Sequence, residues 1–300
     1  MHNLSNTSLK QRLGKIDVGY TKNTTKRLNM LFVCPKCNGK LNIDSNTGAA
    51  RCDKGHSYDR SRFGYYNFLL GASGGVHGDN KEMVAARREF LSRGFYEPLA
   101  ECVARICNDV SFNGAKILDI GCGEGYYTSA VADKCKQKCV KIATFDISKD
   151  AIKETAKKKC AEEYAVASAY HMPVADGSFD IALNLFSPLA VDEVRRSLRV
   201  GGHFIMAIPA EEHLYGLKAA IYDTPYKNAL DDTALEGFSL VSSEELKYEL
   251  NLDTESDIRA LFMMTPYAYR TNKAGIERVL SLKSLKTNAH FIILTYRKEA

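Results

Sequence analysis

A short stretch near the start of the chain carries four potential metal ligands. Cys34, Cys37, Cys52 and His56 follow the spacing Cys-x2-Cys-x14-Cys-x3-His. Three thiolates and an imidazole are the donor set of a tetrahedral structural zinc site, and four protein ligands leave no open position for catalysis. A segment this short cannot bury enough apolar surface to fold alone, so metal would supply much of its folding free energy. The spacing therefore predicts a zinc-ribbon-like domain over residues 30–70.

Inside this module, Lys40–Asp44 alternates like a strand, and Ser45–Gly48 follows as a turn. Beyond His56, aromatic and cationic side chains are interleaved, namely Tyr58, Arg60, Arg62, Phe63, Tyr65, Tyr66 and Phe68. Rings that stack on splayed bases, beside arginines that hold phosphates, would suit an RNA surface. The same rings could instead form the small core of the module. The sequence leaves both readings open.

The chain has 300 residues, of which 45% are hydrophobic and 26% are charged, with a net charge of +5. This is enough for one sizeable core and a small appendage, and the mild basicity is compatible with a nucleic-acid partner. No apolar run reaches the length of a membrane span, and no signal peptide opens the chain. Nine cysteines without an export signal indicate thiols in a reducing cytoplasm.

Two segments flank the module. Residues 1–29 are polar and basic, and we predict a disordered leader, although a basic RNA-seeking arm is an alternative. Residues 71–92 are predicted to be a linker and a helix. In this segment Gly71–Asn80 is rich in glycine, and Asp79 with Glu82 forms a capping-box pattern that would start the helix.

The remaining residues, 93–300, alternate between strand and helix patterns. A strand at Lys116–Ile120 leads directly into Gly121-x-Gly123-x-Gly125 and a helix from Tyr126. Glycines at this place let a backbone approach a ligand at a helix N-terminus, but the spacing is not the one expected for a dinucleotide. A second strand, Lys141–Phe145, ends in Asp146, an acid placed to accept hydrogen bonds from ribose hydroxyls.

Further elements continue the alternation: a helix capped by Ser148 and strands at 165–168, 181–186, 203–208 and 291–296. This order predicts an α/β domain with a doubly wound, mostly parallel sheet. The ordered set resembles the class I S-adenosylmethionine-dependent methyltransferases. Residues 119–125 resemble their first motif, Asp146 their ribose-binding acid, and residues 178–180 with 198–202 their later motifs. The resemblance implies S-adenosylmethionine as cofactor and the Rossmann-like fold of that class.

A closer resemblance covers residues 30 to about 296. The metal pattern, residues 78–91, residues 125–128 and Met264-Thr265-Pro266 with Arg270 resemble the 23S ribosomal RNA guanine-N1 methyltransferases. This family implies a zinc domain, a methyltransferase domain, homodimeric assembly and 23S rRNA as substrate. Zinc would be held by Cys34, Cys37, Cys52 and His56. Cofactor binding is assigned by the motifs and the resemblance together to Tyr96, Asp119, Gly121, Gly123, Glu124, Gly125, Asp146 and His213. One departure is Tyr269, where the family often has tryptophan.

Methylation of guanine N1 requires loss of the N1 proton, and therefore a nearby base or hydroxide. The candidates for the base are Glu124, His77, Asp79, Glu211 and Glu212, and the sequence does not rank them. Residues 184–188 read Asn-Leu-Phe-Ser-Pro, where amino-methyltransferases place Asn-Pro-Pro-aromatic. The missing second proline disfavours methylation of an exocyclic amine. Asn184 could contact the base or close a strand-end turn.

The other cysteines are expected to be plain thiols. Cys122 would pack against the ligand of the glycine loop, and Cys135 and Cys139 are interpreted as free thiols on a basic helix end. The leading hypothesis is an RNA N1-guanine methyltransferase whose zinc module grips the RNA. A small-molecule methyltransferase, and a resistance factor that binds cofactor and RNA without catalysis, are the alternatives. Which guanine is the target does not follow from the sequence.

Overall fold

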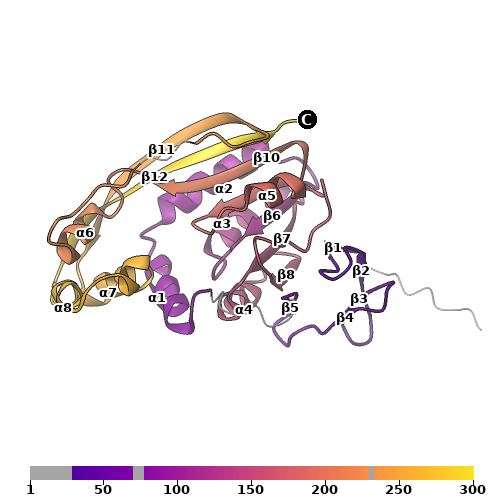
Figure 1. The fold of residues 1–300 in the computed structure, drawn as a ribbon, viewed down its shortest axis with the longest axis horizontal. Coiled ribbons are helices and arrows are strands. Elements are labelled where there is room, and N and C mark those ends of the chain that lie inside the picture. Colours follow the sequence, from indigo (N-terminus) through magenta and orange to yellow (C-terminus); the bar gives the residue numbers. More distant parts are fainter. Residues whose placement is uncertain (1–28, 70–77, 230–232) are drawn as a thin grey trace, which may run out of the picture.

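The computed structural model describes residues 29–69, 78–229 and 233–300. The predicted disorder of the leader, His77 and most of the glycine-rich connector lie outside the described residues. Within these ranges the chain forms two sheets: a small antiparallel sheet at one end of the molecule and a large mixed sheet in the centre (Figure 1).

The small sheet contains the predicted metal ligands. Its four strands are antiparallel neighbours in chain order: β1 Asn29–Val33, β2 Lys40–Ile43, β3 Ala50–Cys52 and β4 Ser57–Tyr58. The expected strand at 40–44 and the turn after it are confirmed. The first Cys pair lies in the β1–β2 turn, and Cys52 ends β3 with His56 in the next turn. The zinc-ribbon-like architecture is therefore present.

The large sheet has the strand order β11-β12-β10-β9-β6-β7-β8-β5. All neighbours from β5 to β10 are parallel, whereas β12 runs antiparallel to both β10 and β11. This is the doubly wound sheet of the class I methyltransferases, as predicted. The strands are β5 Tyr66–Asn67, β6 Lys116–Ile120, β7 Lys141–Asp146, β8 Glu163–Val166, β9 Phe179–Leu185, β10 Leu198–Pro209, β11 Phe238–Leu252 and β12 Leu285–Lys298.

Helices cover the sheet and form a lobe at the end opposite the small sheet, where α6, α7 and α8 lie (Figure 1). In the described ranges no helix has the length and apolar content needed to cross a membrane. The α-helices are α1 Lys81–Ser92, α2 Glu97–Val110, α3 Tyr126–Cys135, α4 Lys149–Lys158, α5 Val191–Ser197, α6 Tyr215–Ile221, α7 Glu255–Met263 and α8 Lys273–Leu280. Two 3-10 turns are η1 Lys136–Lys138 and η2 Pro266–Tyr269.

Both faces of the central sheet are buried, because side chains alternate along its strands. On β6, Ile117 packs into a cluster with α2, α3 and the C-terminal helices. Its neighbour Leu118 packs into a second cluster with α5 and with residues of the small sheet, including Phe32 and Leu41. The small Cys/His sheet therefore shares a core with the large α/β domain.

Backbone pairing joins the two sheets as well. Strand β5 adds to the large sheet beside β8, and the backbone N–H groups of Leu31 and Phe32 donate to the two carboxylate oxygens of Glu163, at 2.7 and 3.0 Å. Val33 donates to the carbonyl of Pro173 at 2.8 Å. The predicted boundary at residue 70 thus lies next to a segment that already belongs to the large sheet.

The start of α1 differs from the sequence expectation. Asn80, not Asp79, caps α1, because its side chain accepts a hydrogen bond from Met83 N, while the carboxylate of Asp79 pairs with Arg87. His213 lies in a turn before α6, which begins at Tyr215. Ser148 caps α4 as predicted.

Candidate functional site

The glycine loop after β6 is folded tightly against its neighbours. Gly121 and Gly125 have φ angles of 70° and 79°, a region that favours glycine. A Cβ at Gly121 would lie 2.3 Å from Cβ of Ser187, and one at Gly125 would lie 2.6 Å from Cγ2 of Thr155. Larger residues would therefore displace the loop from the sheet edge, and Gly125 also serves as the N-cap of α3.

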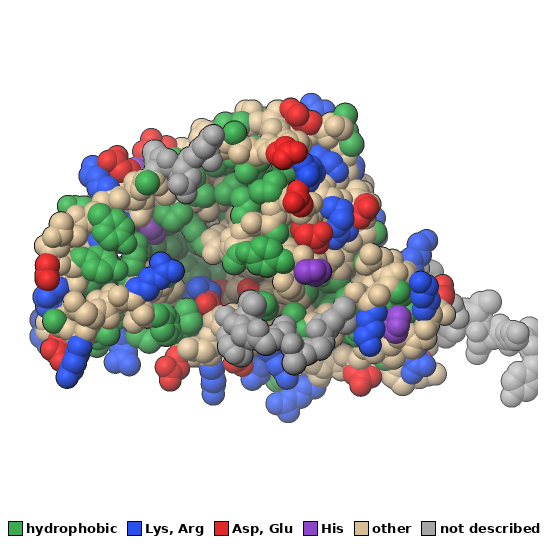
Figure 2. All heavy atoms as spheres, viewed as in Figure 1, with side chains coloured by type: hydrophobic (Ala, Val, Ile, Leu, Met, Phe, Trp, Pro, Cys, Tyr) green, Lys and Arg blue, Asp and Glu red, His purple; other side chains and the backbone are tan. Residues whose placement is uncertain are grey.

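A cavity of about 970 Å³ opens at the carboxyl ends of the parallel strands, above this loop. Figure 2 shows hydrophobic side chains gathered around the hollow between the α6–α8 lobe and the sheet. Seven of the eight predicted cofactor residues line the cavity: Tyr96, Asp119, Gly121, Gly123, Glu124, Asp146 and His213. Gly125 is absent from the lining, and its place in the fold is the close contact of α3 with α4.

Two aspartates, the buried Asp119 and the half-buried Asp146, hold the floor of the cavity. Asp146 accepts hydrogen bonds from Gly123 N at 2.9 Å and from Ser148 N at 2.7 Å, so its carboxylate ties the glycine loop to the start of α4. Asp119 accepts one from Thr128 Oγ1 at 2.5 Å. Burial raises the pKa of Asp119 to about 7, and it also raises the pKa of Asp146. Both side chains would be better satisfied with donors from a bound ligand.

Glu124 is a third acid of the lining, and it is 2% exposed. Its Oε1 makes no hydrogen bond within the described residues and lies 3.5 Å from Nζ of Lys158. A buried carboxylate oxygen without a hydrogen bond is costly. A hydroxyl or ammonium donor in the cavity would remove that cost.

Tyr96 and His213 form the opposite, more apolar wall. Both rings pack against Phe291, with centroids 5.2 and 4.5 Å away. The hydroxyl of Tyr96 is buried without a partner in the part of the chain that the structure describes. Burial lowers the pKa of His213 to about 3, so its ring is neutral. Nδ1 accepts a hydrogen bond from His290 N at 3.3 Å, which leaves the proton on Nε2 as a donor.

These features fit a nucleoside-like ligand that carries hydroxyl and ammonium groups. Asp146 and Glu124 offer acceptors, Tyr96 and His213 offer donors beside apolar surface, and the glycine loop allows close approach of the backbone. S-adenosylmethionine, when bound, supplies an electrophilic methyl group on sulfur. The residues present therefore fit the cofactor.

The candidate bases fall into two groups. Asp79 and Glu124 line the cavity, whereas Glu211 and Glu212 do not and pair with Lys227. Asp79 is paired with Arg87, another lining residue. The cavity thus contains two of the four described candidates.

Sequence reasoning missed the importance of Phe186. It lies in the left-handed region with φ 64°, is 45% exposed, and lines the cavity beside Tyr127 and Phe291. Such a conformation is an outlier for an aromatic residue, and strain of this kind gathers at functional sites. Asn184 donates to the carbonyl of Pro188 at 3.3 Å, so it closes the turn while lining the cavity.

A third set of lining residues comes from the α6–α8 lobe. They are Tyr226, Met264, Thr265, Pro266, Tyr267 and Arg270. Tyr269 lies outside the lining, 57% exposed, and its hydroxyl accepts from Asn80 Nδ2 at 3.4 Å. The aromatic ring at this position therefore does not contact the cavity.

The four predicted metal ligands converge. Their donor atoms all lie within 4.8 Å of one another, and this is the one such group of three or more ligand side chains in the described ranges. Nδ1 of His56 is 3.4 Å from the sulfurs of both Cys34 and Cys52, and Cys37 Sγ is 3.7 Å from Cys52 Sγ. The donor set and its closed geometry fit a structural zinc ion.

The aromatic segment after His56 serves mainly as core. Tyr65, Tyr66 and Phe68 are 3–6% exposed, and the Tyr58 ring packs on Phe68 while its hydroxyl lies 3.2 Å from Cys34 Sγ. Burial raises the pKa of the Cys34 thiol, but the Tyr58 and backbone hydrogen bonds lower it to about 6. The core reading thus holds for these rings.

Phe63 is different. Three cations lie over its ring, Arg62 at 4.8 Å, Lys153 at 5.1 Å and Lys157 at 5.7 Å from the centroid. This basic cluster bridges the metal module and helix α4. Its side chains are compatible with the RNA reading that the sequence left open.

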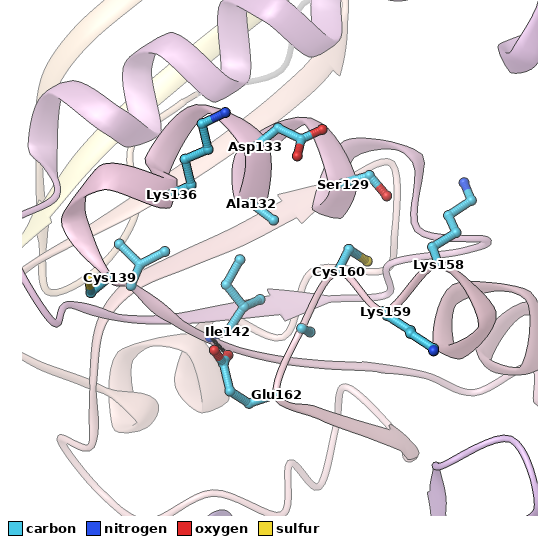
Figure 3. Close-up of a pocket in the computed structure, with 12 residues that line it drawn as sticks. Ser129, Ala132, Asp133, Lys136, Cys139, Ile142, Lys158, Lys159, Cys160 and Glu162 are labelled. Atoms are coloured by element: carbon cyan, nitrogen blue, oxygen red, sulfur yellow. Dashed lines mark hydrogen bonds between the residues drawn. The ribbon is translucent and has the colours of Figure 1, made fainter.

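A second cavity, of about 340 Å³, lies between the end of α3 and the start of β8 (Figure 3). Cys139, Lys158, Cys160 and Glu162 are among its lining residues, and none of the eight predicted cofactor residues is. The two thiols near the end of α3 differ in solvent exposure: Cys135 is buried and Cys139 is exposed. Cys122, as expected, is buried in the lining of the large cavity.

Comparison with known proteins agrees with this geometry. Residues 118–206 match the model of a methyltransferase domain. The chain is 31% identical to a putative 23S rRNA (guanine-N(1)-)-methyltransferase, YxjB, of Bacillus subtilis, over 86% of this chain and 92% of that protein. It is 32% identical to the 23S rRNA (guanine(748)-N(1))-methyltransferase of Streptomyces fradiae, over 77% of this chain and 83% of that protein. A putative 23S rRNA (guanine-N(1)-)-methyltransferase of Micromonospora griseorubida is 32% identical, over 81% of this chain and 88% of that protein. The chain is an S-adenosylmethionine-dependent methyltransferase, and it belongs to the 23S rRNA (guanine-N1) methyltransferase family.

Proposed function

We propose that this enzyme methylates N1 of a guanine in a hairpin of 23S rRNA. The observation that carries the proposal is one cavity with a polar cofactor wall and an aromatic wall on the facing lobe, in a chain whose relatives are named for this reaction. An open cavity of this size can admit a base that is turned out of its stack. The same proposal includes cofactor binding by the eight residues predicted from the sequence. It also includes zinc binding by the Cys/His cluster.

The task of the chain's own residues is to position the base and to remove a proton. A neutral guanine has a hydrogen on N1, and this proton must leave as N1 takes up the methyl group. Asp79 and Glu124 are the described candidate acceptors that line the cavity. Binding in line with the methyl group would supply much of the rate enhancement.

The metal module is proposed to contribute to RNA binding. The cation cluster around Phe63 joins the module to α4, and Arg60 and Arg62 are exposed in the same segment. Cations at these positions could hold phosphates while the target base enters the cavity.

We also propose that the enzyme is cytoplasmic and acts as a homodimer. Light scattering of the purified protein would measure its mass and so test the homodimer.

The direct test is incubation of the protein with labelled S-adenosylmethionine and unmodified 23S rRNA transcribed in vitro. We expect label on the RNA, N1-methylguanine in its nucleoside digest, and a stop at one guanine in primer extension. A matched mixture of small-molecule acceptors without RNA serves as control. RNA that stays unlabelled would refute the proposal, and a methyl group on an exocyclic amine would refute the N1 assignment.

A further inference from the structure

The α6–α8 lobe contains a cation that the cofactor site does not use. Lys218 on α6 is 0% exposed, and burial lowers the pKa of its ammonium group. Nζ donates to the Tyr226 carbonyl at 3.2 Å and to Asn228 Oδ1 at 2.6 Å. A buried ammonium is costly unless its donors are satisfied, so the fold has fixed this group with partners on one loop.

The same ammonium lies against aromatic rings. Nζ is 4.3 Å from the centroid of Tyr226 and 5.9 Å from that of Tyr267, both within the range of a cation–π interaction. Tyr222 packs beside both rings, with centroids 5.7 Å from Tyr226 and 6.3 Å from Tyr267. The loop that carries Tyr226 is thus held through its backbone and its ring at once.

Tyr226 nevertheless remains open to the cavity. It is 51% exposed and lines the cavity with Tyr267 and Arg270. Arg270 is exposed, and the described part of the chain provides it with no ion-pair partner. One face of the Tyr226 ring meets the ammonium, so the exposed part of the side chain is available to a ligand.

We propose that Tyr226 is the surface on which the target guanine stacks, with Lys218 as the positioning residue that holds the ring and places a positive charge behind it. This rests on the proposed function and deepens it by naming where the base binds. Stacking on an aromatic ring is the usual way in which a protein holds an unpaired base. A cation behind the ring withdraws electron density from it, which favours an electron-rich purine and the negative charge left when N1 loses its proton.

Binding can be followed optically, because the chain has no tryptophan. Tyr226→Trp introduces a single indole at the proposed platform, and we expect unmodified 23S rRNA transcript to quench its fluorescence. Phe112→Trp is the matched control: Phe112 also has a cation over its ring, Arg199 at 5.8 Å, but it precedes β6 at the opposite edge of the sheet. Phe186→Trp tests another exposed ring of the cavity.

Kinetics separate stacking from folding. Tyr226→Ala should raise KM for the transcript about ten- to a hundredfold, while the Kd for S-adenosylmethionine changes by no more than about twofold. Lys218→Met, which removes the charge and keeps the length, should raise KM about three- to tenfold and weaken the quenching of Tyr226→Trp. Tyr226→Leu, which keeps apolar bulk without a ring, should behave like Tyr226→Ala.

The outcomes are distinct. Quenching of Tyr226→Trp together with a raised KM supports the proposal. If wild type forms N1-methylguanine but Tyr226→Ala keeps its KM, or if RNA quenches Phe186→Trp and not Tyr226→Trp, the platform is wrong while the proposed function stands. If wild type leaves the RNA unmodified, the proposed function fails and the platform fails with it.

Discussion

The Cys/His cluster proposed to bind zinc and the cavity proposed to bind the cofactor are built in opposite ways. The four ligands of the cluster come from two turns of one small sheet, between Cys34 and His56. The cavity collects residues from Gly78 to Phe291, contributed by five strand ends, the glycine loop and the C-terminal lobe. A local site can be recognised from spacing alone, whereas a distributed site depends on how distant segments pack.

The two regions are nevertheless coupled. Phe32 and Cys34 of the module share a hydrophobic cluster with Leu118 and Phe145. These two residues belong to β6 and β7, strands that lead into the cavity. Glu163 fixes β1 to the large sheet. If the module were independent, its disruption would not affect the large sheet. Substitutions in each region can therefore measure how far the coupling extends.

The largest effect is expected from loss of the proposed metal ligand Cys52. Cys52→Ser should lower the zinc content and reduce RNA methylation by about a hundredfold or more, because metal binding is part of the folding free energy of such a small sheet. Elemental analysis and the RNA assay measure both. Cys139→Ser, which removes an exposed thiol outside the cluster, should behave as wild type. Full RNA activity in a zinc-free Cys52 variant would contradict the prediction.

The next largest effect is expected for Asp146→Ala, a substitution in the cavity. Loss of the carboxylate removes its contacts with Gly123 N and Ser148 N and the acceptors proposed for the cofactor. Calorimetry should show a Kd for S-adenosylmethionine raised by roughly a hundred- to a thousandfold, about 3–4 kcal/mol. The exposed Asp133→Ala on α3 is the control, and unchanged affinity in Asp146→Ala would argue against this acid as a ligand.

The pH dependence of stability tests the junction between the two regions. Burial raises the pKa of Glu163 to about 7, although the Leu31 and Phe32 N–H groups lower it. Because the folded pKa lies above the unfolded value, its stabilisation is fully present below the unfolded pKa of 4.5 and is lost as pH rises through 7. The loss is at most about 3 kcal/mol.

Urea unfolding of wild type and Glu163→Gln between pH 4 and 8 measures this contribution. The wild-type curve should fall with rising pH over the window named above, and the Gln variant should lack that part of the slope. Glu236→Gln, at a side chain that is 91% exposed, should keep it. Parallel curves for wild type and Glu163→Gln would show that this carboxyl group does not titrate at the junction.

The smallest effect is expected for Tyr96→Phe. Removing a buried hydroxyl without a described partner should stabilise the ligand-free protein by about 1 kcal/mol, while binding of S-adenosylmethionine weakens by about three- to tenfold. Thermal unfolding and calorimetry give the two numbers. A variant that is both less stable and unchanged in affinity would mean that the hydroxyl has a structural partner instead.

Local patterns by themselves determined much of this protein. The spacing of four Cys and His residues predicted the cluster, strand and helix periodicity predicted the sheet, and the glycine loop with Asp146 predicted a site at the sheet edge where the cavity lies, because each depends on neighbours close in sequence or on strand order. Tertiary structure decided the rest. Which rings are core, the neutral state of His213, the strained Phe186 and the cation behind Tyr226 follow from contacts between segments far apart in the chain. Burial and packing energies depend on those contacts, and no local pattern records them.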